Sequence, residues 1–394
     1  MERKEGKLLN RLVNLGIGTW VDGIRLSHNL PIQLSLWNGQ VFDLGIFENP
    51  VVRIHVRDPS ALPLLFTPSL DSLTEAYITE RIDLDGKLEE VVDTVYRMST
   101  LPAKSSARSK PASRTKHSRQ WDKTSIRYHH DVSNDFYRLW LDERMVFSCG
   151  YFESGDETLD DAQLRKIDYV LRELNVQPGQ RLLDIGCGWG ALVMRAAANY
   201  GARCVGVTLS ENQYQLATER VRAAGLSDRV EIRLEDYRDV RGTFERITSV
   251  GMFEHIGRDN FPSYFAKIRS LLADDGTLIE HRVTNADSSK GNAQKPAGEF
   301  IGRFMFPAGD DSHLSRVTGA LQESGLEAID VQNLERHYAA TLRRWAERYE
   351  QHAERIRRTV GETKYRTWQV YLAGCAHALS IGSASAHQIV CRKA

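Results

Sequence analysis

Apolar and polar positions alternate in two different ways along the chain. From about residue 126 onward, short apolar runs (RLLDIG, CVGVTL, VEIRL, ITSVGMF and TLIEHRV) are separated by segments of helical periodicity such as residues 211–224 and 261–272. Residues 326–333 and 387–392 read as two further strands, which makes about seven. This order predicts an α/β fold in which helices cover both faces of a mostly parallel sheet.

The N-terminal part follows another pattern. Residues 31–56 contain the alternating runs IQLSLW and VVRIHV, and residues 71–98 read as helical segments around an IDLDG turn. A chain of 394 residues exceeds what one hydrophobic core usually supports, so about two domains are expected. We predict a small α+β accessory domain over residues 1–103 and a larger α/β domain over residues 126–394.

A basic segment separates the two patterns. Residues 101–123 read LPAKSSARSKPASRTKHSRQWDK, with seven basic residues and a single acid among serine, alanine and proline. We predict a basic flexible linker over residues 104–125. A solvated tether explains this composition by itself, and a polybasic segment that binds anionic lipid headgroups is a compatible alternative.

Composition and charge exclude several classes. Hydrophobic residues make up 41% and charged residues 26%, which excludes a mostly disordered or fibrous chain. The 52 lysines and arginines balance the 52 acidic residues, so no overall field favours nucleic acid, and we expect no nucleic-acid partner. Any anionic partner must therefore be met by a local basic patch.

The cysteines and the first residues bear on location. The five cysteines form no C-x-x-C pair and no zinc-like spacing, so we expect free thiols in a reducing compartment and no metal site. The start, MERKEGKLLNRLVNLGIG, has no apolar signal core, and no run of about 18 apolar residues occurs. We expect a cytoplasmic protein that does not span a membrane.

A glycine-rich loop is the clearest candidate for a ligand site. The sequence DIGCGWG, residues 184–190, follows a predicted strand and opens a helix, so its glycines permit a tight turn and a close approach of backbone N–H groups to a ligand. It is no P-loop, because Gly-Lys-Ser/Thr does not follow, and its G-x-G-x-G spacing differs from the dinucleotide G-x-G-x-x-G. The pattern resembles the first motif of Rossmann-like S-adenosylmethionine methyltransferases, and an ordinary strand–helix turn is the alternative.

The next two strand ends carry polar candidates. The second strand ends in TLSENQ, residues 208–213, without the acid that usually binds a ribose, so Thr208 and Gln213 would take that role. Ser210 and Gln213 also fit a simple helix capping box. Tyr237 follows the third strand and either lies along an adenine face or packs in the core.

Four separated stretches carry a family resemblance. They are HHDVSNDFY (129–137) with MVFSCGYF (145–152), the glycine loop, GMFEHIG (251–257) and FIGRFMFP (300–307). This ordered set resembles the cyclopropane-fatty-acyl-phospholipid synthase family over residues 126–393. The resemblance implies a seven-stranded methyltransferase sheet and an S-adenosylmethionine-dependent catalytic domain. It also implies methyl transfer to the cis double bond of a phospholipid acyl chain, followed by ring closure of the carbocation.

The resemblance also implies site residues. The family holds a bicarbonate base with four side chains that match Cys149, Glu254, His281 and Tyr338, and Cys375 matches a cysteine sometimes counted as active. Residues matching the family's cofactor contacts, with their immediate neighbours, are Phe147, Ser148, Asp184, Gly186, Cys187, Gly188, Thr208, Leu209, Ser210, Gln213, Asp236, Tyr237 and Arg238. Taken singly, His281 can also be a strand-end histidine whose hydrogen bonds are satisfied, and Glu254 can be an acid at a helix end. Cys375 can be a buried cysteine in a helix. Tyr338 alone carries a weaker signal than these residues.

The chemistry needs these residue types independently of the family. An alkene has no acidic proton, so the enzyme needs an electrophile, a dry apolar pocket and one base. Glu254 and His281 follow adjacent predicted strands, whose carboxyl ends meet at the ligand crevice of such a sheet. The aromatic residues of segment 300–306 would wall an acyl chain, and core packing is the alternative for at least one of them.

Departures from the family pattern leave the product open. Phe147 and His130 stand where the family has tyrosines, and DDSH (310–313) replaces Gly-x-Leu-Pro. A lipid C-methyltransferase that makes methyl-branched or methylene chains is the alternative enzyme, and a lipid-binding protein with a vestigial cofactor domain is the non-enzymatic one. We expect the surface of a phospholipid bilayer as partner and peripheral association with the inner face of the membrane. The sequence leaves open whether the protein forms a homodimer.

Overall fold

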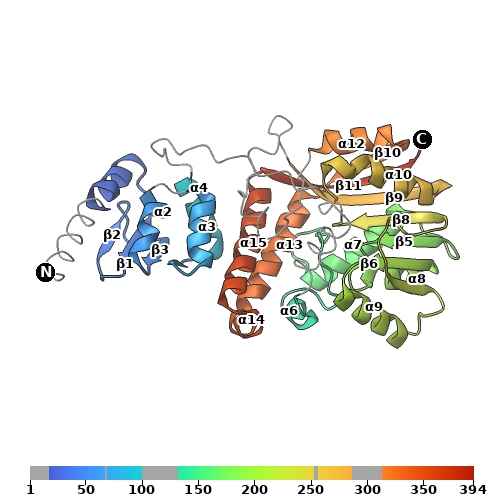
Figure 1. Cartoon of the computed structure of the whole chain (residues 1–394), viewed down its shortest axis with the longest axis horizontal. Coiled ribbons are helices and arrows are strands. Elements are labelled where there is room, and N and C mark those ends of the chain that lie inside the picture. Colours follow the sequence, from blue (N-terminus) through green and yellow to red (C-terminus); the bar gives the residue numbers. More distant parts are fainter. Residues whose placement is uncertain (1–16, 67–68, 100–131, 253–255, 286–312) are drawn as a thin grey trace. The chain divides into compact units, whose positions relative to one another are not determined.

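The computed structural model describes residues 17–66, 69–99, 132–252, 256–285 and 313–394. The chain divides into two compact units (Figure 1), Met1–Lys110 with Glu362–Ala373, and Pro111–Gly361 with Gly374–Ala394. Helix α15 (Glu362–Ser380) therefore contributes its first residues to the N-terminal unit. The sequence had placed these residues within the larger domain, because nothing in their pattern distinguishes them from the helices before them.

The N-terminal unit contains a four-stranded sheet in the order β2-β1-β3-β4. Its elements are a helix over residues 17–27, β1 (Ile32–Leu36), β2 (Val41–Asp43), β3 (Val52–Val56), η1 (Pro59–Ala61), α2 (Leu62–Phe66), α3 (Leu70–Ile78), β4 (Ile82–Asp85) and α4 (Leu88–Ser99). The predicted α+β class is confirmed, and the alternation of residues 31–56 forms β1 and β3, which pair in parallel. The expected IDLDG turn is wrong, because Ile82–Asp85 pairs antiparallel with β3.

Arg366 anchors α15 in the N-terminal unit. Its side chain is nearly buried, and its guanidinium donates to Asp83 Oδ1 at 2.7 Å and to Glu362 Oε1 at 2.6 Å. It also donates to the carbonyl oxygens of Tyr77 and Ile82, and it lies over the Tyr77 ring. A buried guanidinium requires this many acceptors, since an unpaired buried charge is strongly destabilising.

Replacing Arg366 by Met should loosen the N-terminal unit. Burial alone raises the pKa of Asp83, but hydrogen bonds from Arg57 and Arg366 hold it below its ordinary value, so the variant leaves a carboxylate with one partner fewer. We expect the opening free energy of the β4 amides, measured by hydrogen exchange, to fall by about 2–4 kcal/mol. Amides of β5 in the other unit should be unchanged, and R97M at an exposed pair should cost less than about 0.5 kcal/mol. Unchanged β4 protection in R366M would contradict the anchoring role.

The second unit contains a seven-stranded sheet in the order β10-β11-β9-β8-β5-β6-β7. The strands are β5 (Arg181–Ile185), β6 (Arg203–Thr208), β7 (Val230–Leu234), β8 (Phe244–Val250), β9 (Leu272–Asn285), β10 (Leu326–Asn333) and β11 (Ala384–Lys393). β11 pairs antiparallel with β9 and β10, and the pairs among β5 to β9 are parallel. The predicted mostly parallel sheet of about seven strands is confirmed.

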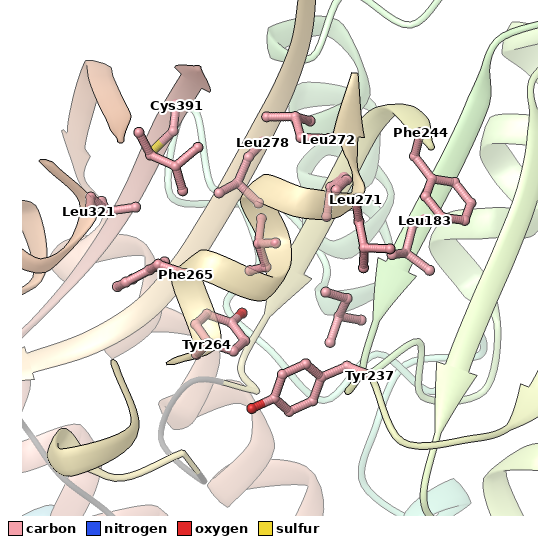
Figure 2. Packing of buried hydrophobic residues seen from close by; sticks show 14 of the residues in the cluster. Leu183, Tyr237, Phe244, Tyr264, Phe265, Leu271, Leu272, Leu278, Leu321 and Cys391 are labelled. Carbon is pink, nitrogen blue, oxygen red and sulfur yellow. The ribbon is translucent and has the colours of Figure 1, made fainter. Parts of the chain in front are cut away.

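Helices cover both faces of this sheet. The helical elements are α6 (Asn134–Arg138), α7 (Leu159–Glu173), α8 (Ala191–Tyr200), α9 (Glu211–Ala223), η3 (Arg258–Asn260), α10 (Phe261–Leu271), α12 (Leu314–Glu323), α13 (Glu335–Gln351) and α14 (Ala353–Val360). Side chains of α10 and α12 pack on one face in the cluster that Figure 2 shows, and those of α7 and α8 pack on the other. Among the residues that the structure describes, no helix is both long and apolar enough to cross a bilayer.

Candidate active site

The glycine loop turns tightly at the carboxyl end of β5. Gly186, Gly188 and Gly190 have φ angles of 80°, 54° and 84°, a left-handed conformation that glycine adopts without the penalty a Cβ imposes. The N–H groups of Gly186 and Cys187 both donate to the carbonyl oxygen of Val207 at 3.0 Å, which fixes the loop against β6. Helix α8 begins directly after Gly190. The loop is therefore the strand–turn–helix arrangement that the sequence predicted.

A cavity lies over this loop at the carboxyl ends of the parallel strands. Ten of the predicted cofactor residues line it, namely Phe147, Ser148, Asp184, Gly186, Cys187, Gly188, Thr208, Leu209, Gln213 and Tyr237. Met145, Lys166, Trp189, Glu235, Gly251 and Met252 are among the other lining residues. Ligands of doubly wound sheets bind in this crevice. The described chain thus gathers most of the predicted residues around one hollow, while their roles as ligand contacts stay predictions.

Asp184 closes the base of the cavity. It is the fourth residue of β5 and is buried. Its Oδ1 accepts a hydrogen bond from Thr248 Oγ1, with 2.7 Å between the two oxygens. Burial raises the pKa of Asp184 to about 6, although the Thr248 hydrogen bond and Lys166 counteract it. Its carboxylate is suited to receive a positively charged ligand group, because such a group offsets the cost of burying the acid.

The polar residues after β6 hold one another in place by hydrogen bonds. Ser210 caps α9, accepting the N–H of Gln213 at 3.3 Å, so the predicted cap is confirmed, and Ser210 is not among the cavity-lining residues. The Gln213 side chain does not complete a capping box, because its Oε1 accepts a hydrogen bond of 2.7 Å from the Thr208 hydroxyl. This bond leaves the Gln213 amide N–H groups available at the cavity wall.

The residues after β7 differ in whether they line the cavity. Glu235 lines the cavity, whereas Asp236 and Arg238 do not, and those two pair with each other through bonds of 2.8 and 2.6 Å. Tyr237 packs in the core, where its ring meets that of Tyr264 edge-on at 5.2 Å (Figure 2), and it also lines the cavity, so contact with an adenine stays a prediction. The pattern L-E-D-Y contains a signal for Glu235, since alternate residues after a strand point the same way and Glu235 and Tyr237 both line the cavity.

Two further residues of α7 reach the site from its buried face. Lys166 is 4% exposed, and its Nζ donates to Ser148 Oγ at 2.9 Å. Gln163 donates to the carbonyl oxygen of Ser148 at 2.7 Å. Both occupy the apolar stripe with Ile167 and Val170, and polar residues on such a stripe are the sequence signal that could have identified them.

A second group of predicted residues forms a buried cluster. Cys149 is fully buried and packs with Leu334 and Ala386, and Tyr338 lies against the same cluster. Burial raises the pKa of the Cys149 thiol to about 12, so it stays protonated, and it lies 3.1 Å from the carbonyl oxygen of Gly150. These side chains supply neutral groups in apolar surroundings.

His281 joins this cluster from β9. Its ring centroid lies 6.5 Å from that of Tyr338, and burial lowers the pKa of the imidazole to about 3, so it is neutral at ordinary pH. Its Nδ1 is buried without a hydrogen-bond partner among the described residues. Directly opposite on β11 lies Gln388, whose Nε2 is likewise buried and unpartnered there. Two unsatisfied polar atoms therefore face the same side of the sheet as Cys149 and Tyr338.

The remaining predictions have other outcomes. Strands β8 and β9 are adjacent as expected, with Val250 opposite His281, but β9 continues four residues beyond His281. Glu254 and the aromatic segment 300–306 lie outside the described residues. Cys375 lies half-buried in α15 and is neither a cavity-lining residue nor a member of the Cys149 cluster.

Family models match both parts of the chain. Residues 117–389 match the model described as mycolic acid cyclopropane synthetase, and residues 20–106 match one described as a domain of unknown function. A probable fatty acid methyltransferase of Pseudomonas putida is 40% identical over 369 residues, 93% of each chain.

Solved structures agree with this. The cyclopropane synthase MmaA2 from Mycobacterium tuberculosis has a TM-score of 0.66 at 33% identity, over 69% of this chain and 98% of that one. The mycolic acid cyclopropane synthase CmaA1, solved in complex with SAH and CTAB, gives the same TM-score, identity and coverage. The chain therefore belongs to the mycolic acid cyclopropane synthetase family of S-adenosylmethionine-dependent cyclopropane synthases and fatty acid methyltransferases.

Proposed function

We propose that the enzyme transfers the methyl group of S-adenosylmethionine to the cis double bond of an unsaturated phospholipid acyl chain and closes a cyclopropane ring. The alkene electrons form the new C–C bond as the sulfonium bond breaks, and S-adenosylhomocysteine leaves. A proton is then lost from the transferred methyl group, and its C–H electrons close the ring. The observation that carries the proposal is the cluster of buried Cys149, buried His281 and partly buried Tyr338 against strands β9 and β11 of the sheet that carries the cofactor cavity.

The cluster suits a small proton-accepting anion. An unsatisfied buried polar atom costs about 1–3 kcal/mol, so the orphaned His281 Nδ1 and Gln388 Nε2 favour a small polar guest between them. Bicarbonate, the base that the family resemblance implies, would accept the proton there. The Tyr338 hydroxyl and the one N–H of the neutral His281 imidazole would donate hydrogen bonds to it, and Cys149, whose thiol stays protonated, would offer its S–H.

The test uses vesicles of cis-monounsaturated phospholipid and methyl-labelled S-adenosylmethionine. Carbon NMR of the product should show cyclopropane carbons carrying the label, and mass alone is insufficient because a ring and a methylated alkene both add one CH2 unit. Bicarbonate added to degassed enzyme should raise the rate, and the E254Q enzyme should respond less. A labelled product without ring carbons would overturn the cyclopropane proposal, and a rate indifferent to bicarbonate would overturn the base.

A second candidate is a lipid C-methyltransferase that makes methyl-branched or methylene chains. It is favoured by the names of two relatives, the Pseudomonas putida protein and a probable fatty acid methyltransferase of Mycobacterium tuberculosis that is 35% identical. The opening methyl transfer is the same. Loss of the proton on the methyl-bearing chain carbon then gives a methyl-branched alkene, whereas a 1,2-hydride shift followed by loss of a proton from the transferred methyl group gives a methylene chain. Olefinic or methyl resonances in the labelled product would select this candidate.

We also propose that the enzyme works at the surface of an anionic bilayer. Leu26 and Ile46 in the N-terminal unit are 88% and 84% exposed, and the sequence predicts a basic linker over residues 104–125. Exposed apolar side chains together with lysine and arginine are typical of peripheral lipid binding. Activity on anionic vesicles should fall about 10-fold between 0.05 and 0.5 M salt, since salt screens such attraction. Activity on zwitterionic vesicles is the control, and equal salt dependence on both would remove this role.

A further inference from the structure

Lys166 places a cation inside the cofactor cavity. The side chain comes from the middle of α7, lines the cavity and is 4% exposed. Its one hydrogen bond is the 2.9 Å donation to Ser148 Oγ, so the remaining N–H bonds of the ammonium have no acceptor among the described residues. An ammonium with a single hydroxyl acceptor is costly to bury.

Two buried carboxylates, Asp142 and Asp184, act on the Lys166 ammonium through space, but neither forms a hydrogen bond with it among the described residues. Asp184, which shares the cavity, has one oxygen engaged by Thr248. Asp142 is also buried, and its two oxygens accept backbone N–H groups of Val146 and Arg144. An anionic group of a bound ligand would satisfy the ammonium directly.

We propose that Lys166 is a cofactor-binding residue that holds the carboxylate of the amino-acid end of S-adenosylmethionine, together with the Ser148 hydroxyl. S-adenosylmethionine carries one carboxylate, and this family uses that cofactor. Because Ser148 Oγ accepts a hydrogen bond from Lys166, the Ser148 hydroxyl can itself donate a hydrogen bond to a second acceptor in the cavity. Lys166 and Asp184 then face the carboxylate and the ammonium of the same amino acid, one charge for each.

The Lys166 ammonium also acts electrostatically on the cluster that contains His281. Burial lowers the pKa of Lys166 to about 8, although the carboxylates of Asp142 and Asp184 oppose this shift, and the lysine in turn helps to lower the pKa of His281. Below pH 8 the ammonium is present and able to bind a carboxylate. Above pH 8 ligand binding must first take up a proton, so affinity should decline there.

The experiment compares two ligands and two proteins by calorimetry. S-adenosylhomocysteine and its decarboxylated analogue differ only in the carboxylate, and K166M removes only the cation from a side chain of similar length. We expect wild type to prefer S-adenosylhomocysteine by about 10- to 100-fold, the scale of a charge-assisted pair, and K166M to lose that preference. The analogue should bind both proteins within about 3-fold. K267M, which removes a half-buried lysine bound to the Val240 carbonyl, is the matched control and should behave as wild type.

Each result decides the matter. A K166M protein that loses affinity for both ligands equally would show a structural role and overturn the proposal, and unchanged affinity for S-adenosylhomocysteine would do the same. Between pH 7 and 9.5, the carboxylate preference of wild type should decline while that of K166M stays flat. Cofactor binding is measured without lipid, so this test and the product analysis can fail independently.

Discussion

A Gly186→Val protein should fold but lose affinity for S-adenosylhomocysteine by at least about 100-fold. Gly186 has a φ of 80°, where a β-branched residue is strained, and a Cβ there would lie 3.1 Å from Met252 Cγ, a side chain that also lines the cavity. The added methyl groups would therefore enter the space over the loop, and the N–H that binds Val207 would be displaced. Calorimetric titration of the purified variant measures the loss.

Gly179→Val is the matched control for backbone strain. Gly179 has a φ of 84°, nearly that of Gly186, but nothing lies within 4 Å of its Cβ position, and it is not a cavity-lining residue. Both variants should lose about 1–3 kcal/mol of stability, whereas only G186V should lose cofactor affinity. Equal affinities of G186V and wild type would mean that the cofactor does not lie against this loop.

A His281→Gln enzyme should turn over at least about 100-fold more slowly while binding S-adenosylhomocysteine within about 3-fold of wild type. His281 does not line the cofactor cavity, but its unpartnered Nδ1 lies in the buried cluster with Cys149 and Tyr338. Glutamine keeps a polar group but places its donor and acceptor differently, which misaligns a hydrogen bond in a dry site. Rates on labelled vesicles and calorimetry separate the two effects.

His387→Gln tests whether any histidine of this sheet would give the same result. His387 lies on β11 opposite Arg282, on the other face from His281, and its Nδ1 bonds the Thr284 hydroxyl at 2.9 Å. H387Q should retain nearly full turnover. Because burial lowers the pKa of His281 to about 3, the imidazole is charged only below that pH, and the wild-type rate should show no step from His281 between pH 5 and 8. A fully active H281Q enzyme would exclude His281 from the reaction.

The sheet could be predicted because its strands follow simple rules. The run RLLDI in β5 is buried from its second residue on, as expected for a parallel strand covered on both faces, and the glycine loop follows it directly. The order of the apolar runs then gives a parallel sheet with its ligand crevice. The IDLDG stretch was mistaken for a turn, because four residues ending in an exposed aspartate have little periodicity of their own and depend on pairing with β3.

The candidate site was predicted less completely, for a physical reason. Residues on the glycine loop are local to a motif, but Lys166 and Gln388 reach the site from α7 and β11, and only tertiary packing brings them there. Lys166 is marked in sequence only as a cation on an apolar stripe, a signal that snorkelling lysines also give. Gln388 is marked only by lying opposite His281, which depends on strand order and register.

The contribution of α15 to the N-terminal unit affects the order in which the chain can fold during synthesis. Arg366 supplies the cation that Asp83 and the carbonyl oxygen of Ile82 bind, yet about 260 residues separate the end of α4 from the start of α15. At ~5–20 residues per second, these residues occupy the ribosome for roughly 13–50 s. The four strands of the N-terminal unit are thus made early, but the ion pair of Arg366 with Asp83 forms only when most of the methyltransferase sheet has already been synthesised. A chaperone that binds nascent chains would therefore meet this unit before α15 completes it.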